Sequence, residues 1–135
     1  YRIYSKSIFS IGLSNSKEVD NDGIVIATKS SMKKSLDKIN YDYALIDSVD
    51  LMINKPYFNF NKADSISVSV AAASIIAKVC RDSMMSKIYD KLYTDYFFKN
   101  NKGYGSNKHI EIMKNIGLCP IHRKTFKPNS ELIRK

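Results

Sequence analysis

The sequence predicts an α/β sandwich, in which helices pack against a small sheet. Short apolar runs that suit strands alternate with longer stretches of helical periodicity. Apolar residues make up 44% of the chain and charged residues 26%, which is ordinary globular composition. No repeat, low-complexity tract or linker divides the 135 residues. One soluble domain is therefore expected.

The first third of the chain is predicted to form a strand, a turn and a helix. Residues 8–13 are apolar with Phe and Ile, as in a strand, and the polar residues 14–22 suit a turn. From Ile24 onward, apolar residues recur at helical spacing. They are Val25, Met32, Leu36 and Ile39. One amphipathic helix fits this pattern.

Two further strands are predicted in the middle of the chain. Residues 43–46 form a brief apolar run that ends at Asp47. Residues 56–61 are aromatic and alternating, and Asp64 follows them. Both carboxylates are therefore expected just beyond the carboxyl ends of strands.

The second half of the chain is predicted to be mainly helical. Ser67 is a candidate N-cap for a helix that continues to residue 87, and small residues at 71–74 would let this helix lie close to a sheet as the most buried one. Residues 100–105 form a loop rich in Gly and Asn. Ser106 can then cap a short helix that Gly117 ends. The remaining residues are expected to be extended and basic.

The charge balance suggests a polyanionic partner without establishing one. Twenty-two Lys and Arg face thirteen Asp and Glu, a net charge of +9, which suits nucleic acid. A solvated Lys-rich surface explains the charge equally well. The two cysteines form neither a disulfide framework nor a metal-ligand spacing, so a reducing cytoplasm is the expected compartment. The longest apolar run is too short and too polar to span a membrane.

Asp47 and Asp64 are the candidate metal ligands. In open α/β sheets, ligands gather beyond the carboxyl ends of strands, so two acids there can converge on a hard cation. The competing explanation is that a strand-end Asp caps the turn that follows it, which is common. The residue pattern alone leaves both explanations open.

Several segments of the chain resemble ribonuclease HII. One segment covers residues 62–82, from Lys-Ala-Asp to Cys-Arg-Asp, and a second is the Lys-Gly-Tyr-Gly-Ser-Asn-Lys-His run at 102–109. The closing segment at 120–126 follows in the family's order. Shorter matches upstream, among them Ala-Leu-Ile-Asp at 44–47, extend the resemblance over most of the chain.

This resemblance implies a fold, a reaction and roles for three residues. The fold is a ribonuclease H-like mixed sheet flanked by helices, with a C-terminal helical extension. The family's enzymes hydrolyse the RNA strand of RNA–DNA hybrids and nick DNA at embedded ribonucleotides, with four carboxylates around two Mg²⁺ or Mn²⁺ ions. Asp47 and Asp64 match the later two of those carboxylates, which are both catalytic and metal-binding.

The third residue, Tyr104, matches the substrate-binding tyrosine that stacks on the sugar beside the scissile ribonucleotide. The alternative for Tyr104, one of nine tyrosines, is a packing role. Arg81 and Asp82 are expected to belong to the scaffold. A complete enzyme is expected to be a monomer.

Three departures from the family pattern matter. Ser48 stands where the family commonly has Gly, so the turn after Asp47 is expected to be less free to take a positive φ. Residues 49–60 are aromatic and Asn-rich in place of a Pro-rich loop. The family's Asp-Glu pair, its Gly-Arg-Gly loop and the first strands have no counterpart in the sequence. Residues 1–135 are therefore expected to form a partial ribonuclease H type-2 domain.

Two other readings of the sequence stay open. One is a catalytically incomplete nucleic-acid-binding remnant, which keeps the basic surface and Tyr104. The other is ribonuclease HIII, which is disfavoured because its third acid is Glu where this chain has Asp47.

Overall fold

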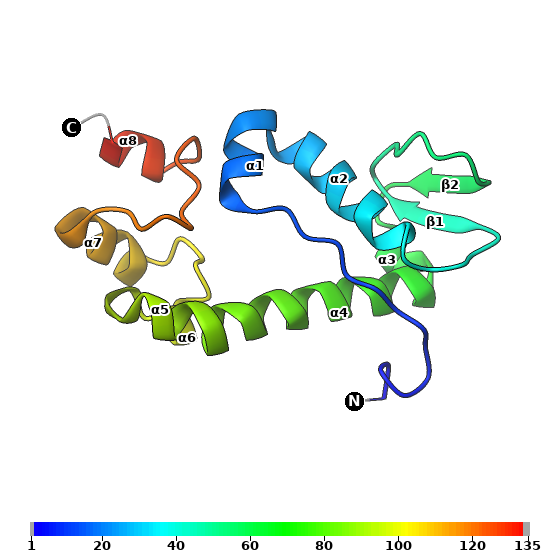
Figure 1. Cartoon of the computed structure of the whole chain (residues 1–135), viewed down its shortest axis with the longest axis horizontal. Helices are drawn as coiled ribbons and strands as arrows, with labels where there is room; N and C mark the ends of the chain where they lie inside the picture. The colour runs from blue at the N-terminus through cyan, green and yellow to red at the C-terminus, as the bar shows by residue number, and fades with distance from the viewer. Residues whose placement is uncertain (1, 134–135) are drawn as a thin grey trace. The chain divides into compact units, whose positions relative to one another are not determined.

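The computed structural model describes residues 2–133, which fall into two compact units. Unit 1 contains the described residues up to Ser14 together with Ile24–Lys78, and unit 2 contains Asn15–Gly23 and the described residues from Val79 onward. The 17-residue helix α4 (Val68–Met84) carries the chain from unit 1 into unit 2 (Figure 1). Helices and a small parallel sheet make up the regular structure, so the predicted α/β class is confirmed.

Unit 1 is built around a parallel pair of strands, β1 (Ala44–Asp47) and β2 (Tyr57–Phe60), which lie side by side in Figure 1. Both strands lie where the apolar runs predicted them. Asp47 is in register with Phe60, which places Asp47 at the carboxyl edge of the sheet. The predicted amphipathic helix is α2 (Ile24–Leu36), which ends before the predicted Ile39, and its Met32 and Leu36 pack against the buried residues of this unit.

The strand predicted at residues 8–13 is wrong, because this segment has no regular structure. Two of its backbone carbonyl groups accept hydrogen bonds from lysine side chains further along the chain instead of from a neighbouring strand. Lys34 donates to the Leu13 carbonyl and Lys38 to the Ile11 carbonyl, both at 3.1 Å. A Cβ on Gly12 would lie 1.8 Å from the Ser31 carbonyl oxygen, so glycine permits this close approach to α2.

Unit 2 is helical and has its own core. Its elements are α1 (Ser16–Asp22), the end of α4, the π-helical turn η1 (Met85–Tyr89), α5 (Asp90–Leu92), the 3₁₀ turn η2 (Thr94–Tyr96), α6 (Phe98–Asn101), α7 (Asn107–Ile116) and α8 (Asn129–Ile133). Tyr96, Phe98, Met113 and Cys119 form the buried core. The predicted caps of α7 are confirmed: the Ser106 hydroxyl accepts from the His109 N–H, and Gly117 ends the helix with φ +82°. The C-terminal helices agree with the expected helical extension.

Residues 14–22, expected as a turn, contain helix α1. A capping box begins it: the Asn15 side chain accepts from the Glu18 N–H at 2.9 Å, and the Glu18 carboxylate accepts from the Asn15 N–H at 2.7 Å. These reciprocal bonds satisfy donors that the first turn of a helix leaves unpaired. The polar composition that suggested a turn is therefore that of a capped helix start.

Three expectations for the second half also need correction. Helix α4 begins directly after Ser67 as predicted, and the helical run continues past Met84 through the π-helical turn η1, so it covers the predicted residues up to 87. It is not the most buried helix, because only Ile76 is buried along α4. The predicted loop at 100–105 begins only after α6, and the extended C-terminal stretch contains α8. Within residues 2–133, no helix is both long and apolar enough to cross a membrane.

Candidate active site

Asp47 has the capping role, one of the two explanations that the sequence left open. It is the last residue of β1, and its Oδ1 accepts hydrogen bonds from the Ala63 N–H at 3.1 Å and from the Ser48 hydroxyl at 2.9 Å. The bond to Ala63 caps the first turn of α3 (Ala63–Ile66), so the capping role is real. Among the described residues, the side-chain bonds of this carboxylate all use Oδ1. The second oxygen, Oδ2, is therefore available for another ligand.

Asp64 is the second residue of α3 and is exposed. The preceding Lys62 has a left-handed backbone, with φ +58°, and turns the chain from β2 into this helix. Because Asp47 bonds to the N–H of the residue directly before Asp64, the fold brings the two acids to the same edge of the sheet. Carboxylate oxygens at such an edge are the donors that hard divalent cations prefer.

The two carboxylates do not by themselves make a full metal cage. Among residues 2–133, no group of three or more His, Cys, Asp or Glu side chains is arranged to hold a metal ion. The edge therefore offers two carboxylate groups of the kind that hard divalent cations bind.

Ser48 adopts the positive φ that was expected to be less accessible to it in the turn after Asp47. Ser48 adopts φ +59° although it is not glycine, so the substitution does not prevent the left-handed turn. Its hydroxyl donates to Asp47 Oδ1, and its N–H donates to the Phe60 carbonyl at 3.2 Å. Short polar residues tolerate this conformation because their side chains can bond locally. Ser48 thus orients the Asp47 carboxylate at some backbone cost.

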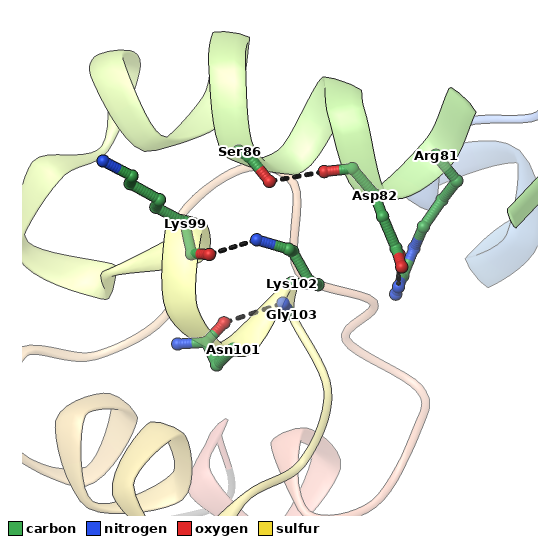
Figure 2. A network of polar contacts seen from close by, with 7 residues as sticks. All are labelled: Arg81, Asp82, Ser86, Lys99, Asn101, Lys102 and Gly103. Carbon is green, nitrogen blue, oxygen red and sulfur yellow. Dashed lines mark hydrogen bonds and ion pairs between the residues drawn. The ribbon is translucent and has the colours of Figure 1, made fainter. Parts of the chain in front are cut away.

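Tyr104 lies in unit 2, on the loop between α6 and α7. Half of its surface is exposed, at 50%, which differs from the buried Tyr96 of the core. The guanidinium carbon of Arg81 lies 4.3 Å from the centre of the Tyr104 ring, a cation–π contact. Arg81 also pairs with Asp82 through a 2.8 Å bond from Nη1 to Oδ1 (Figure 2). This part of the scaffold therefore supports an exposed aromatic side chain.

The two histidines form a buried pair in unit 2. Their Nε2 atoms lie 3.2 Å apart and their rings stack with centres 5.2 Å apart. Burial and the neighbouring His109 lower the pKa of His122 to about 4, and burial also lowers the pKa of His109. Burial therefore favours the neutral form of both rings, which pack in the interior of unit 2.

Sequence reasoning missed two side chains that organise unit 2. Asp20 accepts from the Lys124 N–H at 2.8 Å, the Thr125 N–H at 3.0 Å and the Thr125 hydroxyl at 2.7 Å. Burial acts to raise the pKa of Asp20, but these hydrogen bonds outweigh it and hold the pKa below its ordinary value. Asn101 bonds to the loop that carries Tyr104 and approaches His109 Nδ1 at 3.1 Å. Neither Asp20 nor Asn101 belongs to a periodic sequence pattern that would predict these contacts. The glycines after Asn101 do indicate a loop, and such a loop needs a side chain to hold it in place.

Comparison with known proteins identifies the family. Residues 6–129 match the sequence profile of the family described as Ribonuclease HII. The chain is 43% identical over 125 residues to a Ribonuclease HII of Enterococcus faecalis, covering 91% of this chain and 49% of that protein. It is 45% identical over 123 residues to one of Listeria innocua, covering 90% and 47%, and 39% identical over 139 residues to one of Acholeplasma laidlawii, covering 100% and 68%.

The chain spans about half the length of the first two of these relatives. The match nevertheless covers both units, the acidic edge of the sheet and the Tyr104 loop. On this evidence the chain belongs to the ribonuclease HII family.

Proposed function

We propose that this chain supplies the later two metal-binding carboxylates and the sugar-stacking tyrosine of a ribonuclease HII. Such an enzyme is an endonuclease that hydrolyses the RNA strand of RNA–DNA hybrids and nicks DNA at embedded ribonucleotides. The observation that carries the proposal is the bond between Asp47 Oδ1 and the Ala63 N–H, which ties one strand-end acid to the residue before the other. The same proposal treats residues 1–135 as part of a single ribonuclease H type-2 domain.

The proposed metal ligands are Asp47 and Asp64, and the ions are Mg²⁺ or Mn²⁺. Ser48 and Ala63 bond to Oδ1 of Asp47, so Oδ2 of this carboxylate is the oxygen that would bind a cation. Asp64, exposed in the first turn of α3, presents its carboxylate without a recorded internal partner among the described residues. Two such ions, when bound, activate the attacking water and stabilise the leaving oxygen of the phosphodiester.

Substrate binding follows from charge and stacking. The net charge of +9 attracts the phosphate backbone, and the half-exposed Tyr104 offers a ring for a nucleotide sugar. Neither Cys80 nor Cys119 forms a disulfide within residues 2–133, which supports a reducing compartment, and we propose the cytoplasm. We further propose that the complete enzyme acts as a monomer.

The test uses the protein expressed from its complete reading frame. We expect it to cut a hybrid, and a DNA duplex with one ribonucleotide, in Mg²⁺ or Mn²⁺ but not in EDTA. Asp47→Asn and Asp64→Asn should each lower the turnover by a factor of a hundred or more, on the order of one lost transition-state contact. Hybrid binding without metal-dependent cutting would contradict the proposal in favour of a binding protein. For the 135-residue chain alone we expect no cutting, because it carries only two of the family's four carboxylates.

A further inference from the structure

The loop that carries Tyr104 is anchored to the interior of unit 2 by one side chain, Asn101 (Figure 2). Its Oδ1 accepts from the Gly103 N–H at 2.7 Å, and its Nδ2 donates to the Tyr96 carbonyl at 2.7 Å. Because one end of the amide faces a donor and the other an acceptor, its orientation is determined. Nδ2 also lies 3.1 Å from Nδ1 of the fully buried His109. Asn101 therefore joins the loop to the best-packed part of the unit.

The backbone of the loop turns sharply around this anchor. Lys102 and Gly103 take consecutive left-handed conformations, with φ +53° and +73°. The Tyr104 N–H then donates to the Asn101 carbonyl at 2.9 Å, and the Ser106 N–H donates to the Tyr104 carbonyl at 2.8 Å. Both backbone groups of Tyr104 are thus engaged within the loop, so the position of its Cα is set by Asn101 and the cap of α7.

The ring of Tyr104 has a separate support. The guanidinium of Arg81 lies over it at 4.3 Å. Asp82 holds this guanidinium through the 2.8 Å ion pair, which Figure 2 shows. The Arg81 side chain is 42% exposed and the Asp82 side chain 23%, so this support lies at the surface beside the half-exposed ring. The planar guanidinium of Arg81 restricts the Tyr104 ring more than an aliphatic neighbour would. The reason is that a cation–π attraction requires the cation to lie over the face of the ring.

We propose that Asn101 and Arg81 are positioning residues, which hold the backbone and the ring of Tyr104 in the orientation that stacks on a nucleotide sugar at an RNA-to-DNA junction. The inference rests on the proposed function and assigns roles to two residues outside the metal site. An aromatic ring that is already held in place loses less conformational entropy when it stacks on a substrate. The resulting gain in affinity applies only to substrates that offer a stacking surface, so it appears as selectivity. Loss of either support should therefore lower junction preference more than general affinity.

The experiment measures binding in EDTA, where no cutting occurs, by the protein expressed from its complete reading frame. Each variant is titrated with a duplex that contains one RNA-to-DNA junction and with a plain DNA duplex of the same sequence. We expect Arg81→Met to reduce the ratio of the two affinities about fivefold, the scale of an exposed cation–π contact. Arg81→Lys should recover part of the loss, because it keeps the charge but not the planar stack.

Arg123→Met is the matched control. Arg123 also lies in unit 2 and covers an aromatic ring, that of Phe126, at 3.9 Å. Its replacement removes the same charge and the same kind of contact without touching Tyr104. We expect it to weaken binding to both duplexes by a similar factor and to leave their ratio unchanged.

A double variant shows whether Arg81 acts through the tyrosine. In the background of Tyr104→Ala, Arg81→Met should cause no further loss of junction preference. Asn101→Ala should give the same pattern, and if it does not fold, Arg81→Met alone decides. An equal loss on both duplexes for Arg81→Met would make Arg81 a phosphate contact and overturn the inference. A wild-type protein without junction preference would overturn the proposed function itself, so the two failures are distinguishable.

Discussion

The buried histidine pair predicts that unit 2 loses stability in mild acid. His122 has a pKa of about 4 in the folded protein, against 6.5 as its ordinary value, because burial and the neighbouring His109 disfavour its charged form. Between these two values the unfolded chain binds more protons than the folded one. Stability is therefore complete above pH 6.5, falls as the pH decreases through this window, and levels off near pH 4. His109, whose pKa is also lowered by burial, acts in the same direction.

The size of the effect follows from the shift in pKa. Each unit corresponds to ~1.4 kcal/mol, so His122 alone accounts for at most about 3.5 kcal/mol of the free energy of unfolding. That is a large part of the ~5–15 kcal/mol that stabilises a typical domain. Other groups in the same core do not offset it, because burial raises the pKa of the Cys119 thiol and of the Tyr96 hydroxyl and keeps both neutral.

The assay has two parts. Urea unfolding at a series of pH values from 7.5 to about 4.5 gives the free energy of unfolding, and an NMR titration of the imidazole protons gives the pKa of each ring directly. His122→Gln, which cannot titrate, should lose most of the pH dependence while being less stable at pH 7. An imidazole of His122 that titrates near 6.5, or a wild-type stability that stays constant over the window, would refute the reasoning.

Three further predictions concern the acidic edge and the loops. In the protein expressed from its complete reading frame, Asp64→Asn should abolish metal-dependent cleavage yet keep or raise the melting temperature. Asp82→Asn should instead cost up to ~1 kcal/mol of stability and keep the Mg²⁺ and Mn²⁺ dependence of cleavage, and the reverse pattern would move the metal ligand to Asp82. Ser48→Gly should stabilise the protein by about 0.5–1 kcal/mol in thermal unfolding, because glycine has no penalty at φ +59°. Asp20→Ala should destabilise unit 2 by about 0.5–1.5 kcal/mol in urea unfolding, since it removes the carboxylate acceptor of the Lys124 and Thr125 N–H groups at a partly exposed position where water replaces part of the loss.

The sequence by itself determined the elements whose signals are local. The apolar runs of β1 and β2 and the periodicity of α2 depend only on neighbouring residues, and the structure has all three where they were predicted. Helix α7 is a further example. The Ser106 side chain caps its start and the backbone of Gly117 ends it, so both signals are local. The resemblance to ribonuclease HII likewise rests on contiguous motifs, and the family comparison confirms it.

The tertiary structure alone decided where the remaining side chains bond. Residues 8–13 have the composition of a strand, but lysines more than twenty positions away take two of their carbonyls. The capping of α3 by Asp47 and the stacking of Arg81 on Tyr104 each join residues more than fifteen positions apart in the chain. Such contacts depend on how the elements pack, and packing selects among many partners that the sequence leaves equally possible. Local propensity therefore determined the elements, while long-range hydrogen bonds and ring contacts determined the candidate site.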